Sequence, residues 1–288
     1  MKISNWLLTL GLAIGMCATA AATDRDITLG DRIITIPAPE GFTALLPSME
    51  PYYTTIGAYV GPGNIRFATF VTTEAGEALA AGDESYELDR YVNVETETGI
   101  STASVSRAGF AELRETVRTQ IEELYANTLV QLPELAAAGD KTVSEAFSAD
   151  IEMEVGSVVP LPTHLDTDEM MAHSIYMTVG AALNGEDVGT DTLAATTLFL
   201  HVKDKVLFLY AYGAKSDLAW TREKTVEWAR DIIAANPLNA EEQAAVDAPA
   251  TSGIDWGRVS GRALIGGLAG FVIGLFSFLM NRRKKADG

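Results

Sequence analysis

The chain has 288 residues, 48% of them hydrophobic, and its formal net charge is −18. Residues 23–253 alone carry 14 basic and 37 acidic side chains, and this net charge of −23 disfavours binding to nucleic acid or to anionic lipid headgroups. With a single cysteine, Cys17, the chain cannot close an internal disulfide, so its stability must come from a packed core.

The N-terminus has the pattern of a secretory signal peptide. A basic residue precedes an apolar run at residues 6–17, and small residues follow that run. We expect a signal peptide over residues 1–22 with cleavage after Ala20 or Ala22. The alternatives are an uncleaved anchor and a lipoprotein signal at Cys17.

The first part of the exported segment predicts antiparallel strands. Residues 27–36 predict a hairpin that turns at Gly30. Two strands are expected at residues 54–60 and 65–72, because the residues between them are rich in turn-forming types. Alternating valines predict a strand over residues 91–98 with one face exposed to water.

The period of the apolar residues then changes from two to three or four, which predicts an amphipathic helix over residues 107–132. Its apolar positions are Phe110, Leu113, Val117, Ile121 and Leu124. Pro133 is expected to end this helix, followed by a break at residues 136–140 and a short helix over residues 142–147.

The last part of the domain predicts more strands and a closing helix. A strand is expected at residues 151–159, followed by three consecutive strands at residues 174–183, 193–202 and 206–212. The last two are apolar on both faces, so they should lie centrally in the sheet. A helix over residues 218–235 follows.

The C-terminal part predicts a membrane anchor. Residues 237–255 are acidic and aperiodic, which indicates a flexible linker after a domain at 23–236. An uncharged run at residues 263–280 predicts a transmembrane helix, which with its flanks covers residues 256–281. The basic tail, residues 282–288, marks the cytoplasmic side, so the domain should be periplasmic, attached to a bacterial-type inner membrane by one helix. The alternative is a sorting tail that is removed after export.

Three glycines in the expected anchor are spaced four residues apart, at Gly266, Gly270 and Gly274. They share one helix face, which lets a second transmembrane helix approach closely. This indicates self-association or a membrane partner. The alternative is that glycine is common in membrane helices.

A cluster of potential metal ligands follows the strand at residues 151–159. Its members are His164, Asp166, Asp168, Glu169 and His173. Nitrogen and oxygen donors so close together could bind zinc or another divalent ion. However, the spacing fits no standard zinc signature, so the alternative is a polar loop. Acids in residues 184–191 could hold calcium, but a hairpin loop would have the same composition.

Signatures of catalysis are missing from the sequence. There is no G-x-S-x-G or S-x-x-K motif for a nucleophile, and no G-x-G-x-x-G or P-loop for a nucleotide. No catalytic residue and no cofactor are therefore assigned. Trp220 and Trp228 lie eight positions apart on the closing helix, so one should pack inward while the other is partly exposed; the alternative is that they line a ligand groove.

The order of elements predicts an α+β fold with helices packed on an antiparallel sheet. The opening pattern is Ile33, Thr35, Ile36 and Pro37, followed by Glu40, Gly41 and Phe42. Together with the element order, this pattern resembles the Mog1/PsbP-like class of domains. The resemblance implies a binding or assembly factor, because the class has no common catalytic site. We therefore expect a membrane-anchored binding or envelope-assembly factor, with a metal-binding protein or metal-dependent hydrolase as the alternative.

Overall fold

The computed structural model describes residues 24–83, 86, 88–250 and 253–270. The strands are β1 (Arg25–Leu29), β2 (Arg32–Ile36), β3 (Phe42–Ala44), β4 (Asn64–Thr72), β5 (Tyr91–Glu97), β6 (Ile151–Pro160), β7 (Leu165–Asp166), β8 (Met170–Leu183), β9 (Glu186–Val202) and β10 (Lys205–Ala214). The helices are α1 (Tyr52–Ala58), α2 (Thr73–Ala80), α3 (Arg107–Phe147), η1 (Lys215–Asp217), α4 (Leu218–Ala235), α5 (Ala240–Val246) and α6 (Trp256–Ala269).

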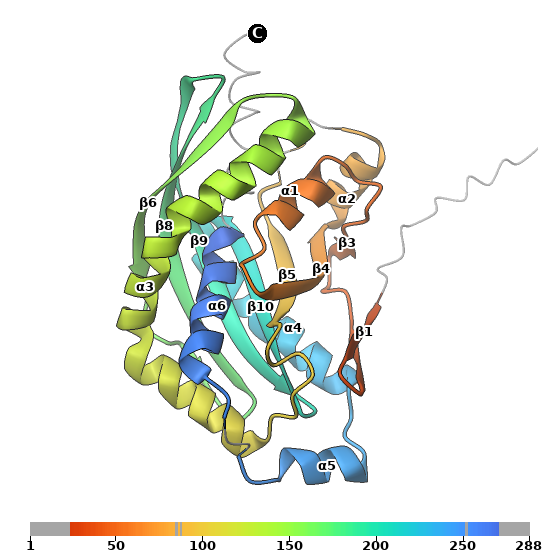
Figure 1. Cartoon of the computed structure of the whole chain (residues 1–288). Helices are drawn as coiled ribbons and strands as arrows, with labels where there is room; N and C mark the ends of the chain where they lie inside the picture. Colours follow the sequence, from red (N-terminus) through yellow and green to blue (C-terminus); the bar gives the residue numbers. More distant parts are fainter. Residues whose placement is uncertain (1–23, 84–85, 87, 251–252, 271–288) are drawn as a thin grey trace, which may run out of the picture.

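One antiparallel sheet forms the middle layer of the molecule. Its strand order is β3-β4-β5-β10-β9-β8-β6, with β7 paired to β8, and β1 and β2 form a separate hairpin. Helices α1, α3 and α6 cover one face of this sheet, while α4 covers the other (Figure 1). The described part is therefore an α+β fold of three layers, as the sequence predicts.

Several predicted elements are confirmed. The hairpin turns at Gly30, whose φ of 59° suits glycine. The three consecutive strands are β8, β9 and β10, and they pair in sequence order near the centre of the sheet. The closing helix is α4, where Trp228 is buried and Trp220 is partly exposed. Both tryptophans thus lie as their spacing predicts.

The strand predicted at residues 54–60 is wrong, because this segment forms α1. Its β-branched threonines favour a strand, but its larger side chains recur with helical spacing. Tyr52, Ile56 and Tyr59 are buried in the core. The Glu50 carboxylate also accepts a hydrogen bond from the Thr54 amide at 3.1 Å, which supports the first turn of the helix.

Helix α3 continues through Pro133 to Phe147, so the predicted end and the predicted break are both wrong. Proline inside a helix leaves the carbonyl four residues earlier without its amide partner. Pro133 and Leu129 lie on the exposed side of α3, where water can satisfy that carbonyl. On the buried side, a side chain at Gly139 would overlap the ring of Tyr59, so glycine permits the close contact with α1.

The segment predicted as a flexible linker, residues 237–255, contains α5. Asn239 caps this helix by accepting hydrogen bonds from the Glu241 and Glu242 amides, both at 2.9 Å. The Glu242 carboxylate in turn accepts from the Asn239 amide at 2.9 Å, which completes a capping box. Val246 is buried. The linker prediction is therefore wrong over the length of α5.

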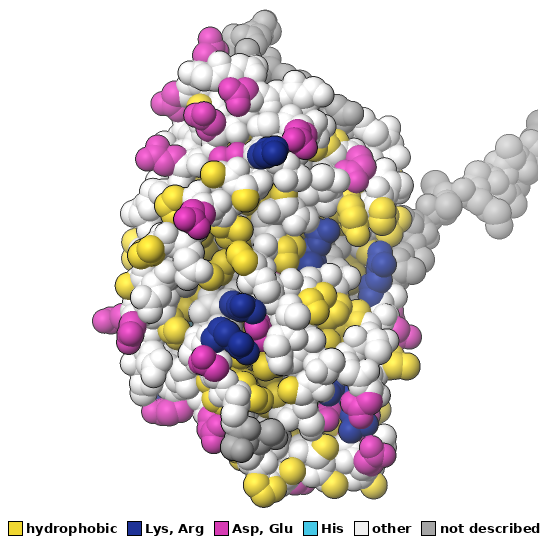
Figure 2. Space-filling model, viewed as in Figure 1, with side chains coloured by type: hydrophobic (Ala, Val, Ile, Leu, Met, Phe, Trp, Pro, Cys, Tyr) yellow, Lys and Arg dark blue, Asp and Glu magenta, His cyan; other side chains and the backbone are white. Residues whose placement is uncertain are grey.

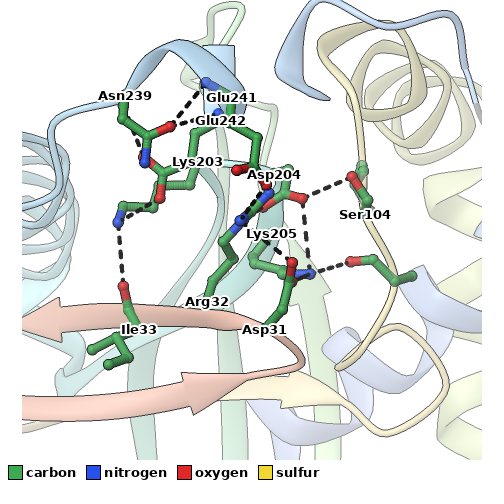
Figure 3. A network of polar contacts seen from close by, with 12 residues as sticks. Asp31, Arg32, Ile33, Ser104, Lys203, Asp204, Lys205, Asn239, Glu241 and Glu242 are labelled. Atoms are coloured by element: carbon green, nitrogen blue, oxygen red, sulfur yellow. Dashed lines mark hydrogen bonds and ion pairs between the residues drawn. The ribbon is translucent and has the colours of Figure 1, made fainter. Parts of the chain in front are cut away.

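A network of polar contacts fixes α5 and the hairpin to the turn between β9 and β10 (Figure 3). The buried Asp204 carboxylate accepts hydrogen bonds from Arg32 Nε at 3.0 Å and from Ser104 Oγ at 2.8 Å. Beside it, Lys203 forms an ion pair with Glu242 of α5 at 2.9 Å. Four parts of the chain that lie far apart in sequence therefore meet at this turn.

The predicted transmembrane helix, residues 256–281, is described only as far as Gly270. Its first part forms α6, which lies on the sheet beside α3 (Figure 1). None of the described helices combines the length and the apolar character of a membrane span. The remainder of the predicted anchor, the tail at 282–288 and the signal at 1–22 lie outside the described residues.

Candidate functional site

Polar and aromatic side chains gather on the face of the sheet that α6 covers. They come from β4, β5, β9 and β10, where they alternate with apolar side chains that point to the α4 face. We call this surface the polar face. Its members are Asn64, Tyr91, Asn93, Glu95, Glu97, Thr197, Tyr210 and Tyr212, all of them buried except Asn64. The strand predicted at residues 91–98 is β5. One of its faces was expected to be exposed to water, but both faces are buried, because α6 covers the polar one.

Glu95 lies at the centre of the polar face and is 1% exposed. Burial raises the pKa of its carboxyl to about 7, although Asn64 and Arg66 both act to lower it. Asn64 Nδ2 donates a hydrogen bond to the carboxyl at 3.0 Å. Glu95 can therefore hold or release a proton near neutral pH.

Three tyrosine hydroxyls of the polar face donate hydrogen bonds to backbone carbonyls of α6. Tyr210 donates to the carbonyl of Ala263 at 2.9 Å and Tyr212 to that of Gly266 at 3.2 Å. Tyr91 donates to the carbonyl of Gly270. The acceptors lie three or four residues apart, so they form one row along the helix. The polar face thus recognises the backbone of α6.

The predicted glycine row allows this close approach. A Cβ atom at Gly266 would lie 2.7 Å from the Tyr210 hydroxyl and 2.9 Å from Glu95 Oε2. A side chain at Gly270 would overlap the ring of Tyr212. The structure therefore places these two glycines against the sheet of their own chain. Gly274 lies outside the described residues, and contact with a second transmembrane helix stays a prediction.

Two arginines of α6 neutralise a second buried acid, Glu97. Arg262 forms an ion pair with Glu97 Oε1, and Arg258 Nε lies 3.8 Å from the same oxygen. Figure 2 shows basic side chains gathered over α6 in the middle of this face. Trp256 begins the helix and donates a hydrogen bond from Nε1 to Glu112 of α3 at 3.1 Å. Charge as well as shape therefore matches α6 to its place on the sheet.

The polar face donates hydrogen bonds to carbonyl oxygens and can hold a proton on Glu95. These are properties of a binding surface. Sequence reasoning missed it, although Glu95 and Glu97 alternate with Val92 and Val94 along one strand. That alternation indicates a polar face, but it cannot show which later segment covers that face.

Two carboxylates of the predicted metal cluster, Asp166 and Asp168, accept hydrogen bonds from arginines of α3. Arg114 donates to Asp166 at 2.6 Å and to Asp168 at 3.3 Å. Arg118 also donates to Asp166. Burial would raise the pKa of Asp166, but the hydrogen bonds from Arg118 and Arg114 outweigh it and lower the pKa.

The ring nitrogens of the two histidines of that cluster have no hydrogen-bond partner among the described residues. His173 is fully buried, its ring edge-on to Tyr125 at 5.9 Å between ring centres, and burial lowers its pKa to about 3. Burial, and then the charge of Arg222, lower the pKa of His164 to about 4. Glu169 is exposed. Within the described ranges, no group of three or more His, Cys, Asp or Glu side chains is placed to hold a metal ion.

A groove of about 1000 Å³ lies between the second half of α3 and the edge strand β6, and we call it the α3–β6 groove. Its apolar floor includes Leu132, Ala136, Met153 and Val155. Its acidic residues are Asp140, Glu145, Asp150, Glu152 and Glu154, against one base, Lys141. In Figure 2, acidic side chains gather in the upper part of the view, where the second half of α3 and β6 lie in Figure 1.

The edge of β6 is partly covered by side chains of α3. Asp140 accepts a hydrogen bond from the Met153 amide at 3.0 Å, and Ser144 accepts from the Ile151 amide at 2.9 Å. The groove continues along the strand past these contacts, to Val155 and Gly156. Burial raises the pKa of the Asp140 carboxyl.

Comparison with known proteins gives a weak structural likeness. No family model matches the chain, and neither does any curated protein. The fold is similar to the solution structure of cyanobacterial PsbP (CyanoP) from Synechocystis sp. PCC 6803, with 13% sequence identity and a TM-score of 0.24. The similarity covers 77% of this chain and 96% of that chain. The match is a weak resemblance to the PsbP-like fold, and it transfers no activity and no residue role.

Proposed function

We propose that this chain is a membrane-anchored, extracytoplasmic binding factor without catalytic activity. Its anchor is the segment 256–281, and its ligand is a segment of an envelope protein held in the α3–β6 groove. The size, shape and charge of this groove are the observation that carries the proposal. The second function considered, metal binding or metal-dependent hydrolysis, has no assembled ligand set in the described residues to favour it.

The chemistry of the α3–β6 groove selects the kind of segment. Five acidic residues and a single basic residue line the groove, so a basic segment is favoured and an acidic one is repelled. The apolar floor under these acids fits aliphatic side chains. Because β6 is the edge strand of the sheet, an extended segment can lie alongside it and place alternate side chains in the groove. The expected ligand is therefore an extended segment in which basic and aliphatic residues alternate.

The test uses a synthetic peptide of alternating lysine and valine and measures its binding to the chain by fluorescence anisotropy. The double variant Glu152→Lys, Glu154→Lys should weaken binding by about tenfold or more, because it reverses two charges beside the peptide. The matched control is the double variant Glu223→Lys, Asp231→Lys, which reverses two exposed charges on α4, the helix on the other face of the sheet. Equal loss in variant and control would mean that the peptide responds only to overall charge, and the groove would be the wrong site.

A further inference from the structure

Helix α6 packs on the sheet and is also the start of the segment predicted as the membrane anchor. In sequence, its residues from Ala263 onward begin the uncharged run that ends at Met280. In the structure, the same residues cover the polar face, where Ala263, Leu264 and Leu268 are almost completely buried. The anchor of the proposed function and the cover of the polar face are therefore made from one segment.

These two placements exclude each other by length. As a helix, the run 263–280 extends about 27 Å at about 1.5 Å per residue, close to the hydrocarbon thickness of about 30 Å. If residues 263–270 stay on the sheet, the remaining 271–280 reach only about 15 Å. That is half of the length a membrane span needs. The helix can therefore cover the sheet or span the bilayer, but it cannot do both at the same time.

The contact between α6 and the polar face combines strong and poor features. The row of tyrosine hydrogen bonds and the ion pair of Arg262 with Glu97 hold the helix. Yet three buried polar atoms have no hydrogen-bond partner within the described residues: Ser260 Oγ, Asn64 Oδ1 and Glu97 Oε2. A buried polar atom without a hydrogen-bond partner disfavours the docked state. The docked state is therefore specific without being strongly favoured.

The alternation of apolar and polar residues in β5 also suits a sheet whose polar face is not covered by α6. Val92 and Val94 point to the buried α4 face, while Asn93, Glu95 and Glu97 point to the side that α6 covers. Such alternation is typical of a strand with one face in water. The polar face is thus composed as a surface that water or a polar partner can reach.

We propose that the polar face is a reversible binding site for α6 and that the lipid bilayer competes with it for this helix. When α6 docks, the polar face is closed and the chain has no span. When α6 enters the bilayer, the chain is anchored and the polar face opens. This exchange rests on the membrane anchor of the proposed function. Its test must therefore distinguish failure of the exchange from failure of the anchor.

Gly61 provides a reporter of the docked state. A Cβ atom at Gly61 would lie 3.0 Å from the Gly266 amide nitrogen and 3.2 Å from Cγ2 of Ile265. A Gly61→Cys thiol is therefore covered when α6 docks and open when it leaves. The same proximity suits a disulfide in the double variant Gly61→Cys, Ile265→Cys, which would lock α6 to the sheet. All variants carry Cys17→Ser, and Glu40→Cys, at an exposed position, is the labelling reference.

The full-length chain is synthesised without lipid or with vesicles of phosphatidylethanolamine and phosphatidylglycerol, and a water-soluble maleimide is added. Without lipid, the Gly61→Cys thiol should react at least about tenfold more slowly than the reference, and with vesicles the difference should nearly vanish. The locked double variant should be extracted from vesicles by alkaline carbonate when oxidised and retained when reduced.

Each contrary result has its own meaning. If the Gly61→Cys thiol stays protected in a chain that resists carbonate, docking and anchoring coexist; the exchange is then wrong while the anchor stands. If the thiol reacts quickly even without lipid and the double variant also fails to form its disulfide, there is no docked state and the exchange fails. Extraction by carbonate in both redox states would instead refute the anchor of the proposed function, and the exchange with it.

Discussion

Under the proposed exchange, Glu95 passes from a buried position into water when α6 leaves the sheet. Under α6 it is fully buried, and burial holds its pKa near 7 instead of the ordinary 4.5. The ionisable groups that face it are Arg66 from β4, Tyr91 from β5, and Tyr210 and Tyr212 from β10. Burial raises the pKa of these three tyrosines, so they stay neutral. Of the groups named, Glu95 is the one that titrates near neutral pH.

Docking of α6 should therefore depend on pH through Glu95. Since the docked carboxyl has the higher pKa, docking takes up a proton between about pH 4.5 and about pH 7. Docking is strongest below this window, weakens as the pH rises through it and levels off above it. Labelling of the Gly61→Cys thiol without lipid, relative to Glu40→Cys, should rise by up to about two orders of magnitude across the window.

The variant Glu95→Gln isolates this effect, because glutamine keeps the shape and loses the titration. Its relative labelling rate should be flat over the same pH range. A curve in Glu95→Gln that matches the parent would assign the pH dependence to another group and contradict the role of Glu95.

At the scale of elements, α6 offers a matched pair of glycines for testing what holds it. At Gly266 an added Cβ atom meets Asn64 Nδ2 at 2.6 Å and the Tyr210 hydroxyl at 2.7 Å, whereas at Gly261 nothing lies within 4 Å. Both substitutions to alanine gain about 0.5–1 kcal/mol of helix propensity. Gly266→Ala should nevertheless speed labelling of the Gly61→Cys thiol without lipid, while Gly261→Ala should leave it unchanged or slow it. Equal rates in the two variants would show that α6 does not approach the sheet as closely as described.

Across the whole molecule, patterns within one element were readable from the sequence, and contacts between distant elements were not. The periodicity of Phe110, Leu113 and Val117 gives α3 its buried face, and apolar runs place β9 and β10 centrally. The passage of α3 through Pro133 depends on which side of the helix faces water, which only the packed structure decides. The capping box of α5 emerges from the structure, because the acidic, aperiodic composition of residues 237–255 favoured the linker interpretation. Coverage of β5 by α6 joins segments too far apart for any local pattern to indicate.

The network at the β9–β10 turn is the clearest case of such long-range order, and it can be tested through the motions of two remote segments. Asp204 is buried and holds Arg32 of the hairpin, while the adjacent Lys203 holds Glu242 of α5. Burial would raise the pKa of Asp204, but hydrogen bonds from Ser104 and Arg32 outweigh it and lower the pKa. The carboxylate therefore stabilises the fold above its ordinary pKa of 3.8, and this effect is lost as the pH falls from 3.8 through the lower pKa of the folded state. Asp204→Asn removes the buried carboxylate that accepts from Arg32 and Ser104, and the loss of such hydrogen bonds typically costs about 1–3 kcal/mol.

Hydrogen exchange of the full-length chain at neutral pH, followed by mass spectrometry, is the measurement that resolves this effect by segment. In Asp204→Asn, the amides of β1, β2 and α5 should exchange faster together, because both units attach to the same turn. Asp31→Asn is the control, since Asp31 contacts Arg32 at 3.3 Å and Lys205 at 3.5 Å but its side chain is 68% exposed. Exposed ion pairs contribute little, so the control should leave both segments protected. Faster exchange in the hairpin alone would mean that α5 docks independently of Asp204. The network at the turn would then not stabilise the four parts of the chain together.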